Sequence, residues 1–197
     1  MIIDALDKTI QLKIVYYGPA LSGKTTSLKA LFDHFGKREE VHSIESSINR
    51  TLFFDYGTIM FQNSRWRIKI HIYSTTGQDF YIVTRPITLK AIDGIIFVID
   101  SQQKAWRRNL VSWKELNTYL GDILLKIPKV LAFNKQDLPD KFNPASFLKE
   151  IDFGKYKNIE TRKTIAINSE GILDCFEDIL SLVFKDLHDN KLLMAYS

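Results

Sequence analysis

The sequence contains a single cysteine, Cys175, in 197 residues. One cysteine excludes a disulfide within the chain and suits a reducing compartment, so we expect a cytoplasmic protein in which Cys175 packs as a small core residue. Linkers rich in proline, glycine or serine, internal repeats and low-complexity tracts are also missing. A chain of this length can bury one sizeable core, and we expect one domain over residues 1–197.

Long apolar runs are absent too, because no stretch is long enough to span a bilayer. The N-terminus lacks the basic start and apolar core of a signal peptide. Lipid anchors are not expected either, since position 2 is Ile2 rather than glycine and no cysteine box precedes Ser197. Residues 1–6 are expected to form a short amphipathic turn, which buries too little area to hold a membrane alone. We therefore expect peripheral membrane association at most.

Charge of one sign does not dominate, since 27 Lys and Arg against 23 Asp and Glu leave a formal net charge of +4. Three basic side chains do gather at the start of an expected helix, but apolar residues lie between them; they are Lys104, Arg107 and Arg108. We interpret them as a solvated helix face and expect no nucleic-acid partner.

What the sequence does contain is a phosphate-binding pattern, G-x-x-x-x-G-K-T, over residues 18–25. Residues 10–17 before it alternate and then turn apolar, as a buried strand does, and apolar residues after it recur at helical spacing up to Gly36, the expected helix end. A strand, a glycine turn and a helix N-terminus together aim backbone N–H groups at one point. Lys24 adds charge for the β- and γ-phosphates, and the Thr25 hydroxyl can bind Mg²⁺. The pattern predicts a nucleoside triphosphate site.

A second motif, N-K-x-D at residues 134–137, follows the apolar run 129–133. The Asp137 carboxylate offers two adjacent acceptors for the N1–H and N2–H₂ donors of guanine, whereas adenine would leave it unpaired. Asn134 is expected to join this loop to the phosphate loop, and the stem of Lys135 to cover the base. The motif predicts guanine as the base. A P-loop nucleotide or small-molecule kinase is the alternative, and a comparison of GDP with ADP binding would separate the two.

Strand and helix patterns alternate along the chain. We expect a strand pair at 51–61 and 66–73, a buried strand at 93–100, a helix from Trp106, a last strand at 163–167 and a closing helix with apolar residues from Leu173 to Leu187. Such alternation indicates an α/β fold with a mostly parallel sheet covered on both faces. Ligands of these sheets bind beyond the carboxyl ends of the strands, where both motifs fall.

With both motifs and the strand order in place, the chain resembles the small Ras-like GTPases, and among them the bacterial gliding-motility and cell-polarity group called MglA and its archaeal relatives. The likeness spans most of residues 10–188. It implies a P-loop NTPase of the Ras-like three-layer α/β/α class, with a mostly parallel sheet and one antiparallel edge strand. The segments that carry it are Lys13–Pro19, Leu21–Thr26, Arg50–Asp55, Gly77–Gln78, Asp93–Val98 and Asn134–Pro139.

The resemblance also implies roles for individual residues. Thr51 matches the first-switch threonine that reaches Mg²⁺, Gly77 the second-switch glycine at the γ-phosphate, and Gln78 the glutamine that positions the attacking water. Arg50 matches an arginine finger supplied by the same chain, which would stabilise the transition state beside Gln78. The expected GTP or GDP contacts are Gly18, Pro19, Ala20, Leu21, Ser22, Gly23, Lys24, Thr25, Thr26, Gly77, Asn134, Lys135, Asp137, Asn168 and Ser169, with Thr25 and Thr51 as Mg²⁺ ligands.

Three departures from the Ras-like pattern bear on catalysis. Ser74 replaces the carboxylate of D-x-x-G, as in MglA proteins, which predicts weaker metal binding; Ala20 stands at a loop position that is often glycine; and Pro86 is expected to start a short helix, leaving 78–85 as a loop. The function implied is a GTP/GDP switch with slow hydrolysis, stimulated by an activating partner such as a roadblock-fold dimer, with effectors at the switches. A guanine-nucleotide-dependent scaffold that hardly hydrolyses is the alternative.

Overall fold

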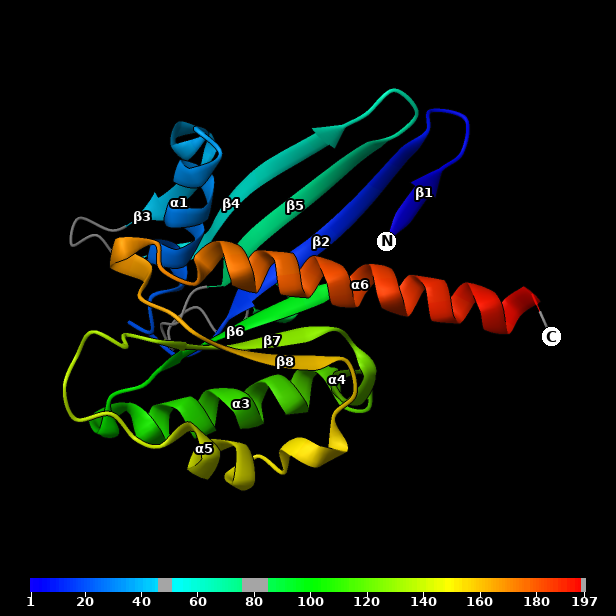
Figure 1. Cartoon of the computed structure of the whole chain (residues 1–197). Helices are drawn as coiled ribbons and strands as arrows, with labels where there is room; N and C mark the ends of the chain where they lie inside the picture. The colour runs from blue at the N-terminus through cyan, green and yellow to red at the C-terminus, as the bar shows by residue number, and fades with distance from the viewer. Residues whose placement is uncertain (46–50, 76–84, 196–197) are drawn as a thin grey trace.

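The computed structural model describes residues 1–45, 51–75 and 85–195 (Figure 1). Within them the chain forms one eight-stranded sheet with helices on both faces. The strands are β1 (Ile2–Asp4), β2 (Thr9–Tyr17), β3 (His42–Glu45), β4 (Thr51–Gln62), β5 (Arg67–Thr75), β6 (Gly94–Asp100), β7 (Lys129–Asn134) and β8 (Ile159–Lys163).

The sheet order is β3-β4-β5-β2-β6-β7-β8, with β1 paired to β2 outside this path. Strands β5, β2, β6, β7 and β8 are parallel. Strand β4 runs antiparallel to β5, and β3 and β1 pair antiparallel to β4 and β2. The mostly parallel α/β class is confirmed; the antiparallel part comprises the expected strand β4, the short β3 outside it and the short β1 beside β2.

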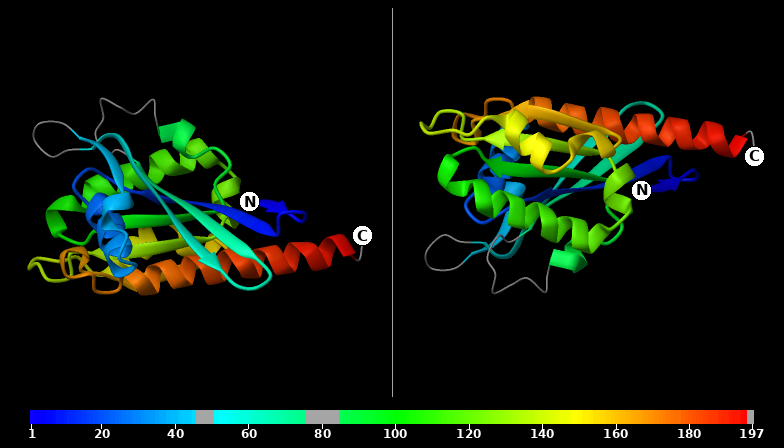
Figure 2. Two further views of the ribbon diagram at one scale, coloured as in Figure 1. Left: turned by 90° about the horizontal axis from the view of Figure 1, so that it is seen from above. Right: turned by 90° about the horizontal axis from the view of Figure 1, so that it is seen from below.

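Helices lie on both faces of the sheet. The α-helices are α1 (Lys24–His34), α2 (Arg85–Thr88), α3 (Trp106–Leu120), α4 (Ile123–Lys126), α5 (Pro144–Glu150) and α6 (Ile172–Ala195); the 3₁₀ turns are η1 (Arg38–Glu40), η3 (Gln103–Ala105), η4 (Phe153–Lys155) and η5 (Ala166–Asn168). Helices α1 and α6 pack on one face, and α3, α4 and α5 on the other. Figure 2 shows α6 running past the end of the sheet.

The central strands carry the core. Every residue of β6 and β7 is buried, as expected for parallel strands covered on both faces. Cys175 of α6 is buried in the cluster under α1 and α6, which confirms the prediction for it. Within the described residues, no helix combines the length and hydropathy that crossing a membrane requires.

A glycine brings β4 against α1. A Cβ on Gly57 would lie 2.4 Å from the ring of Phe32, a fully buried residue of α1. Only a residue without a side chain therefore lets this strand reach the helix. The close packing matters for function because α1 begins at the phosphate loop and β4 begins at Thr51.

Three local predictions were wrong. The last strand is Ile159–Lys163 rather than 163–167, because it lies at the sheet edge with mostly exposed polar side chains and shows no apolar pattern. The apolar Ile167 that suggested a strand is 72% exposed in η5. Residues 2–4 form β1 against β2 rather than an amphipathic turn. Arg85, expected in a loop, is the first residue of α2 and is buried.

Candidate nucleotide-binding site

The phosphate loop joins the carboxyl end of β2 to the start of α1. In the described residues no side chain caps α1 and its first turn carries no acidic residue, so its positive end is left available to an anion. The loop needs glycine at Gly23, whose φ is 106° and whose Cβ would lie 2.2 Å from Nδ2 of Asn134. The pattern at 18–25 thus forms the turn that a phosphate site requires.

Lys24 lies inside this loop. Its Nζ donates to the carbonyl oxygens of Gly18 at 2.9 Å and Pro19 at 2.8 Å, and the side chain is buried. Burial, with a smaller contribution from the nearby Arg85 charge, lowers the pKa of Lys24 to about 7. A buried ammonium held by neutral oxygens is a strong attractor for a polyanion.

Thr25 and Asp55 form the second feature of the loop. The Thr25 hydroxyl donates to Oδ2 of Asp55 at 2.6 Å, and Asp55 is fully buried on β4. The register pairs Asp55 with Ser74 of β5, where most relatives were expected to carry a carboxylate. The structure therefore places a carboxylate beside the expected metal ligand Thr25, contributed by the neighbouring strand.

Two hydroxyls close to the loop are buried without a hydrogen-bond partner among the described residues. They are Oγ of Ser22, within the phosphate loop, and Oγ of Ser74. Native proteins pair most buried hydroxyls, and each exception needs an explanation. Phosphate oxygens or metal-bound water are groups that could accept from them, which fits the chemistry proposed for this site.

Asn134 connects the base motif to the phosphate loop and to the loop after β8, and the sequence predicted the first of these two contacts. Its Nδ2 donates to the carbonyl of Ser22 at 2.8 Å, which confirms the expected tie between base motif and phosphate loop. Its Oδ1 accepts from Thr164 Oγ1 at 3.1 Å and from the N–H of Ala166 at 3.0 Å. The loop after β8 is thereby held against the base motif.

The base-backing segment thus includes residues that the sequence did not single out. Thr164 and Ala166 contact Asn134, whereas Asn168 and Ser169, the residues expected to back the base, lie at the end of η5. Ser169 has φ 63°, and its N–H donates to the carbonyl of Ala166, which closes the turn. Their contact with a nucleotide stays a prediction.

Lys135 and Asp137 lie in the loop after β7, where the sequence predicts the base site. Lys135 has φ 66°, and its Nζ donates to Oδ2 of Asp100 at 2.8 Å; Asp100 is buried at the end of β6. Arg108 also approaches this carboxylate, at 3.5 Å. Asp137 is exposed. Asp100 thus anchors the stem of Lys135, while the Asp137 carboxylate faces solvent, where a base could meet it.

A buried polar cluster lies behind the loop. Glu115 of α3 accepts from Arg85 at 2.6 Å, from the Tyr17 hydroxyl at 2.8 Å and from the Tyr119 hydroxyl at 3.0 Å. Burial and the Glu115 charge raise the pKa of Tyr17, so its hydroxyl stays a donor. Because Tyr17 directly precedes Gly18, this cluster fixes the strand end from which the loop starts.

The expected catalytic residues cannot be placed. Arg50, Gly77 and Gln78 lie outside the described residues, and Thr51 is described only as the first backbone position of β4. Among the other loop residues, Leu21 has φ 61° and is 64% exposed, and Thr26 is exposed. The catalytic half of the site therefore stays a prediction.

Sequence reasoning missed Asp55, Asp100, Thr164 and Ala166. A signal existed for Asp100, since a carboxylate at the end of a fully apolar strand is expected at the ligand edge of a parallel sheet. Asp55 gave little signal, because it alternates with aromatic and glycine neighbours in a strand. Its proximity to Thr25 depends on how β4 packs against α1.

Comparisons with known proteins agree with this geometry. The family model of the ADP-ribosylation factor family matches residues 1–183. The mutual gliding-motility protein MglA of Myxococcus xanthus is 33% identical over 186 residues, covering 91% of this chain and 94% of that protein. Ras-related protein Rab-5B of Plasmodium falciparum is 26% identical over 88% of this chain and 78% of its own. An uncharacterised protein of Methanocaldococcus jannaschii is 29% identical over 68% and 75%. The predicted resemblance is confirmed, and the chain belongs to the ADP-ribosylation factor family of small Ras-like GTPases.

Proposed function

We propose that this protein is a GTP/GDP switch that hydrolyses GTP slowly alone and faster with an activating partner. The observation that supports it most directly is the buried Lys24 ammonium, held by the carbonyls of Gly18 and Pro19 at the N-terminus of α1. Phosphate oxygens would supply the negative charge that these carbonyls lack, and the α1 dipole would add to their binding.

Guanine selectivity rests on Asp137 in this proposal. The exposed carboxylate follows a rigid anchor, since Asn134 binds both the phosphate loop and the loop after β8. Discrimination against adenine would come from the unpaired carboxylate that adenine leaves. Lys135, held by Asp100, would place its stem along one face of the base.

Mg²⁺ would be held by the Thr25 hydroxyl and the Asp55 carboxylate, with Thr51 as the further ligand that the resemblance implies. Oxygen donors of this kind suit a hard cation that also binds phosphates. When bound, the metal would neutralise charge on the β- and γ-phosphates. Asp55 supplies the carboxylate that Ser74 lacks, so the substitution in the second switch would not by itself weaken the metal site.

Hydrolysis would depend on two residues from the switches. Arg50 would stabilise charge on the transferred phosphoryl group, and Gln78 would orient the attacking water. We propose a roadblock-fold dimer as activator, effectors that bind the switches, and a cytoplasmic setting. Ser74 and Ala20 would support the alternative, a scaffold that hardly hydrolyses GTP. The buried Asp55 beside Thr25 favours a hydrolase, because it supplies a carboxylate to the metal site.

Single-turnover hydrolysis tests the proposal. Arg50→Ala and Gln78→Leu should each slow hydrolysis by roughly a hundredfold, the usual cost of about 2.7–4 kcal/mol for losing a stabilising donor. GTP affinity should stay within a factor of two to three, because these interactions form mainly in the transition state. Measurements with and without the organism's roadblock-fold proteins separate intrinsic from stimulated rates. Equal rates in wild type and both variants, with and without partner, would support the scaffold instead.

A further inference from the structure

Within the part of the chain that the structure describes, one face of β2, β4 and β5 lacks the layer of long helices that covers the core strands. Helices α1 and α6 pack on one side of β2, β4 and β5, while the side chains on their other side are half-buried or exposed. The strand register aligns these side chains across the sheet. We call this surface the open face; it comprises Gln11 and Lys13 of β2, Tyr56, Thr58 and Met60 of β4, and Arg67, Lys69, His71 and Tyr73 of β5.

The open face is positively charged. It carries Arg67, Lys69 and Lys13, and one carboxylate, Asp4 of β1, lies on the same side of the sheet, where the register places it opposite Thr9 and so next to Arg67. Burial and the charges of Lys69 and Lys13 lower the pKa of His71, so its ring is neutral at pH 7. The three cations outnumber the one carboxylate on this side of the sheet, so the surface has a net positive charge.

The carboxylates nearest to the face have other partners. Oδ1 of Asp4, on β1, accepts from the N–H groups of Leu6 and Asp7 and so shapes the hairpin turn. Asp93, before β6, accepts from the N–H of Lys13 at 2.8 Å. Burial lowers the pKa of Lys13 and the Asp93 charge partly offsets this, while the Nζ of Lys13 donates to the carbonyl of Lys90 at 2.8 Å. Neither Asp4 nor Asp93 is among the charges that act on His71.

Ring packing argues against stacked bases as the occupant. The rings of Tyr56 and Tyr73 lie 4.8 Å apart, and Tyr56 also stacks on His71. Nζ of Lys13 lies 4.9 Å from the Tyr73 ring centre. These ring faces are therefore already used within the protein, whereas single-stranded nucleic acids need free aromatic platforms.

The apolar content suits a protein surface better than a bilayer. Met60 is 50% exposed, and Ile2 of β1, paired with Gln11 in the register, is 64% exposed. Between them lie Lys69 and Gln11, so the row has an apolar side chain at each end and two polar side chains in the middle. A few apolar contacts inside a charged, hydrogen-bonding surface are typical of protein interfaces.

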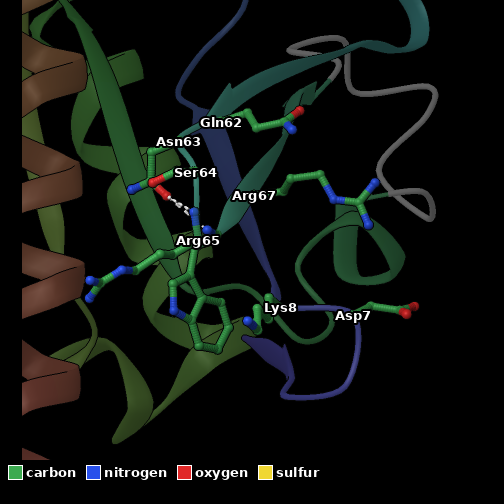
Figure 3. A pocket seen from close by; sticks show the side chains of 8 residues that line it. Asp7, Lys8, Gln62, Asn63, Ser64, Arg65 and Arg67 are labelled. Atoms are coloured by element: carbon green, nitrogen blue, oxygen red, sulfur yellow. Dashed lines mark hydrogen bonds between the residues drawn. The ribbon is translucent and has the colours of Figure 1, made fainter.

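The positive charge continues past the strands. The tips of the β1–β2 and β4–β5 turns line a shallow hollow of about 150 Å³ that contains Lys8, Arg65 and Arg67 (Figure 3). In this view Arg65 points toward α6, whereas Arg67 points to the opposite side, toward the open face. Asp7 is the acidic side chain among the residues that line the hollow.

We infer that the open face docks an acidic segment of a partner protein, whose carboxylates pair with Lys69 and Arg67 and whose apolar side chains lie against Met60 and Ile2. The inference goes beyond the proposed switch and does not rest on GTP hydrolysis. It names a partner chemistry for a surface that lies outside the nucleotide site.

The test is fluorescence anisotropy with a labelled peptide of alternating glutamate and tyrosine, and the same peptide with lysine for glutamate as the negative probe. The GDP-loaded full chain should bind only the acidic peptide, with affinity that falls as salt rises. Lys69→Glu and Arg67→Glu should each weaken binding at least tenfold. Lys149→Glu, an equal charge change on α5, should leave it within twofold. Matching melting temperatures establish that each variant is folded.

A pH series provides an independent readout. Carboxylates bound beside His71 raise its pKa, so affinity should rise as the pH falls from about 7.5 to 6, and His71→Gln should flatten this dependence. Equal losses of peptide affinity in Lys69→Glu and Lys149→Glu, or no binding of the acidic peptide at low salt, would overturn the inference. Lys69-dependent binding to phosphatidylserine vesicles or to oligouridylate without peptide binding would also overturn it, in favour of a membrane or RNA.

Discussion

Nucleotide binding should take up a proton at Lys24. In the nucleotide-free protein, burial lowers the pKa of Lys24 to about 7 from the ordinary 10.5. That difference in pKa means that burial disfavours the charged form of Lys24 by about 5 kcal/mol. Phosphate oxygens can offset this cost because they stabilise the ammonium form. Affinity should therefore be greatest below about pH 7 and weaken as the pH rises above it.

Calorimetry measures this proton directly. Titrating GDP at pH 8 in buffers of different ionisation enthalpy should show uptake of roughly nine-tenths of a proton, against about one-tenth at pH 6. A phosphate with pKa near 6 is already ionised at pH 8, so it contributes little there. Folding has the opposite pH trend from nucleotide binding: the unfolded chain holds more protons between about pH 7 and 10.5, so Lys24 makes the nucleotide-free protein more stable as pH rises through that range.

A second buried lysine serves as the control. Lys129 of β7 has a pKa lowered to about 8 by burial, and its Nζ donates to the carbonyl of Lys157, at the end of the strand away from the phosphate loop. Lys129→Met should leave the uptake at pH 8 unchanged, whereas Lys24→Met should abolish it along with most of the affinity. Uptake near zero in the wild type, or its loss in Lys129→Met alone, would refute the assignment of the proton to Lys24.

Three further predictions follow from single contacts. Asp137→Asn should weaken GDP at least tenfold in calorimetry and raise relative affinity for xanthine nucleotides, because an amide nitrogen would face the donors of guanine; equal binding of ADP and GDP by the wild type would contradict the base assignment. Asp55→Asn should raise the Mg²⁺ concentration needed for tight GTP binding about tenfold, and adding Ser74→Asp to this variant should lower that concentration part of the way back. Identical Mg²⁺ titration curves for the wild type and Asp55→Asn would show that Asp55 has no metal role. Gly57→Ala should lower the free energy of unfolding by about 1–3 kcal/mol in urea titrations, since its Cβ would meet the Phe32 ring at 2.4 Å; an unchanged midpoint would mean that the ring can move aside.

The site separates into parts that a sequence can and cannot reveal. The phosphate loop and the base motif are contiguous strings whose chemistry depends on near neighbours, so both were found together with their strands. The tie from Asn134 to the phosphate loop was also predictable, because the ends of parallel strands meet at one edge. Arg50 and Gln78 rest on the resemblance alone, and their placement stays a prediction.

Edge strands were the least predictable elements. Strand β8 pairs with only one neighbour and exposes most of its side chains, so burial imposes no alternation on its sequence. Strand β1 is three residues long, and its extended conformation is stabilised by pairing with β2. In both cases backbone pairing across the sheet, rather than local pattern, decides the conformation.

The sequence by itself determined the class of fold and the position of the loop, and it predicted guanine as the base, because glycine spacing, apolar periodicity and charge act over a few residues. Only the tertiary structure decided which distant groups complete the site: Asp55 reaches Thr25, Asp100 holds Lys135, and Thr164 binds Asn134. It also left one face of β2, β4 and β5 without a helix layer in the described residues. These pairings depend on strand order and register, which place residues far apart in the chain within hydrogen-bonding distance.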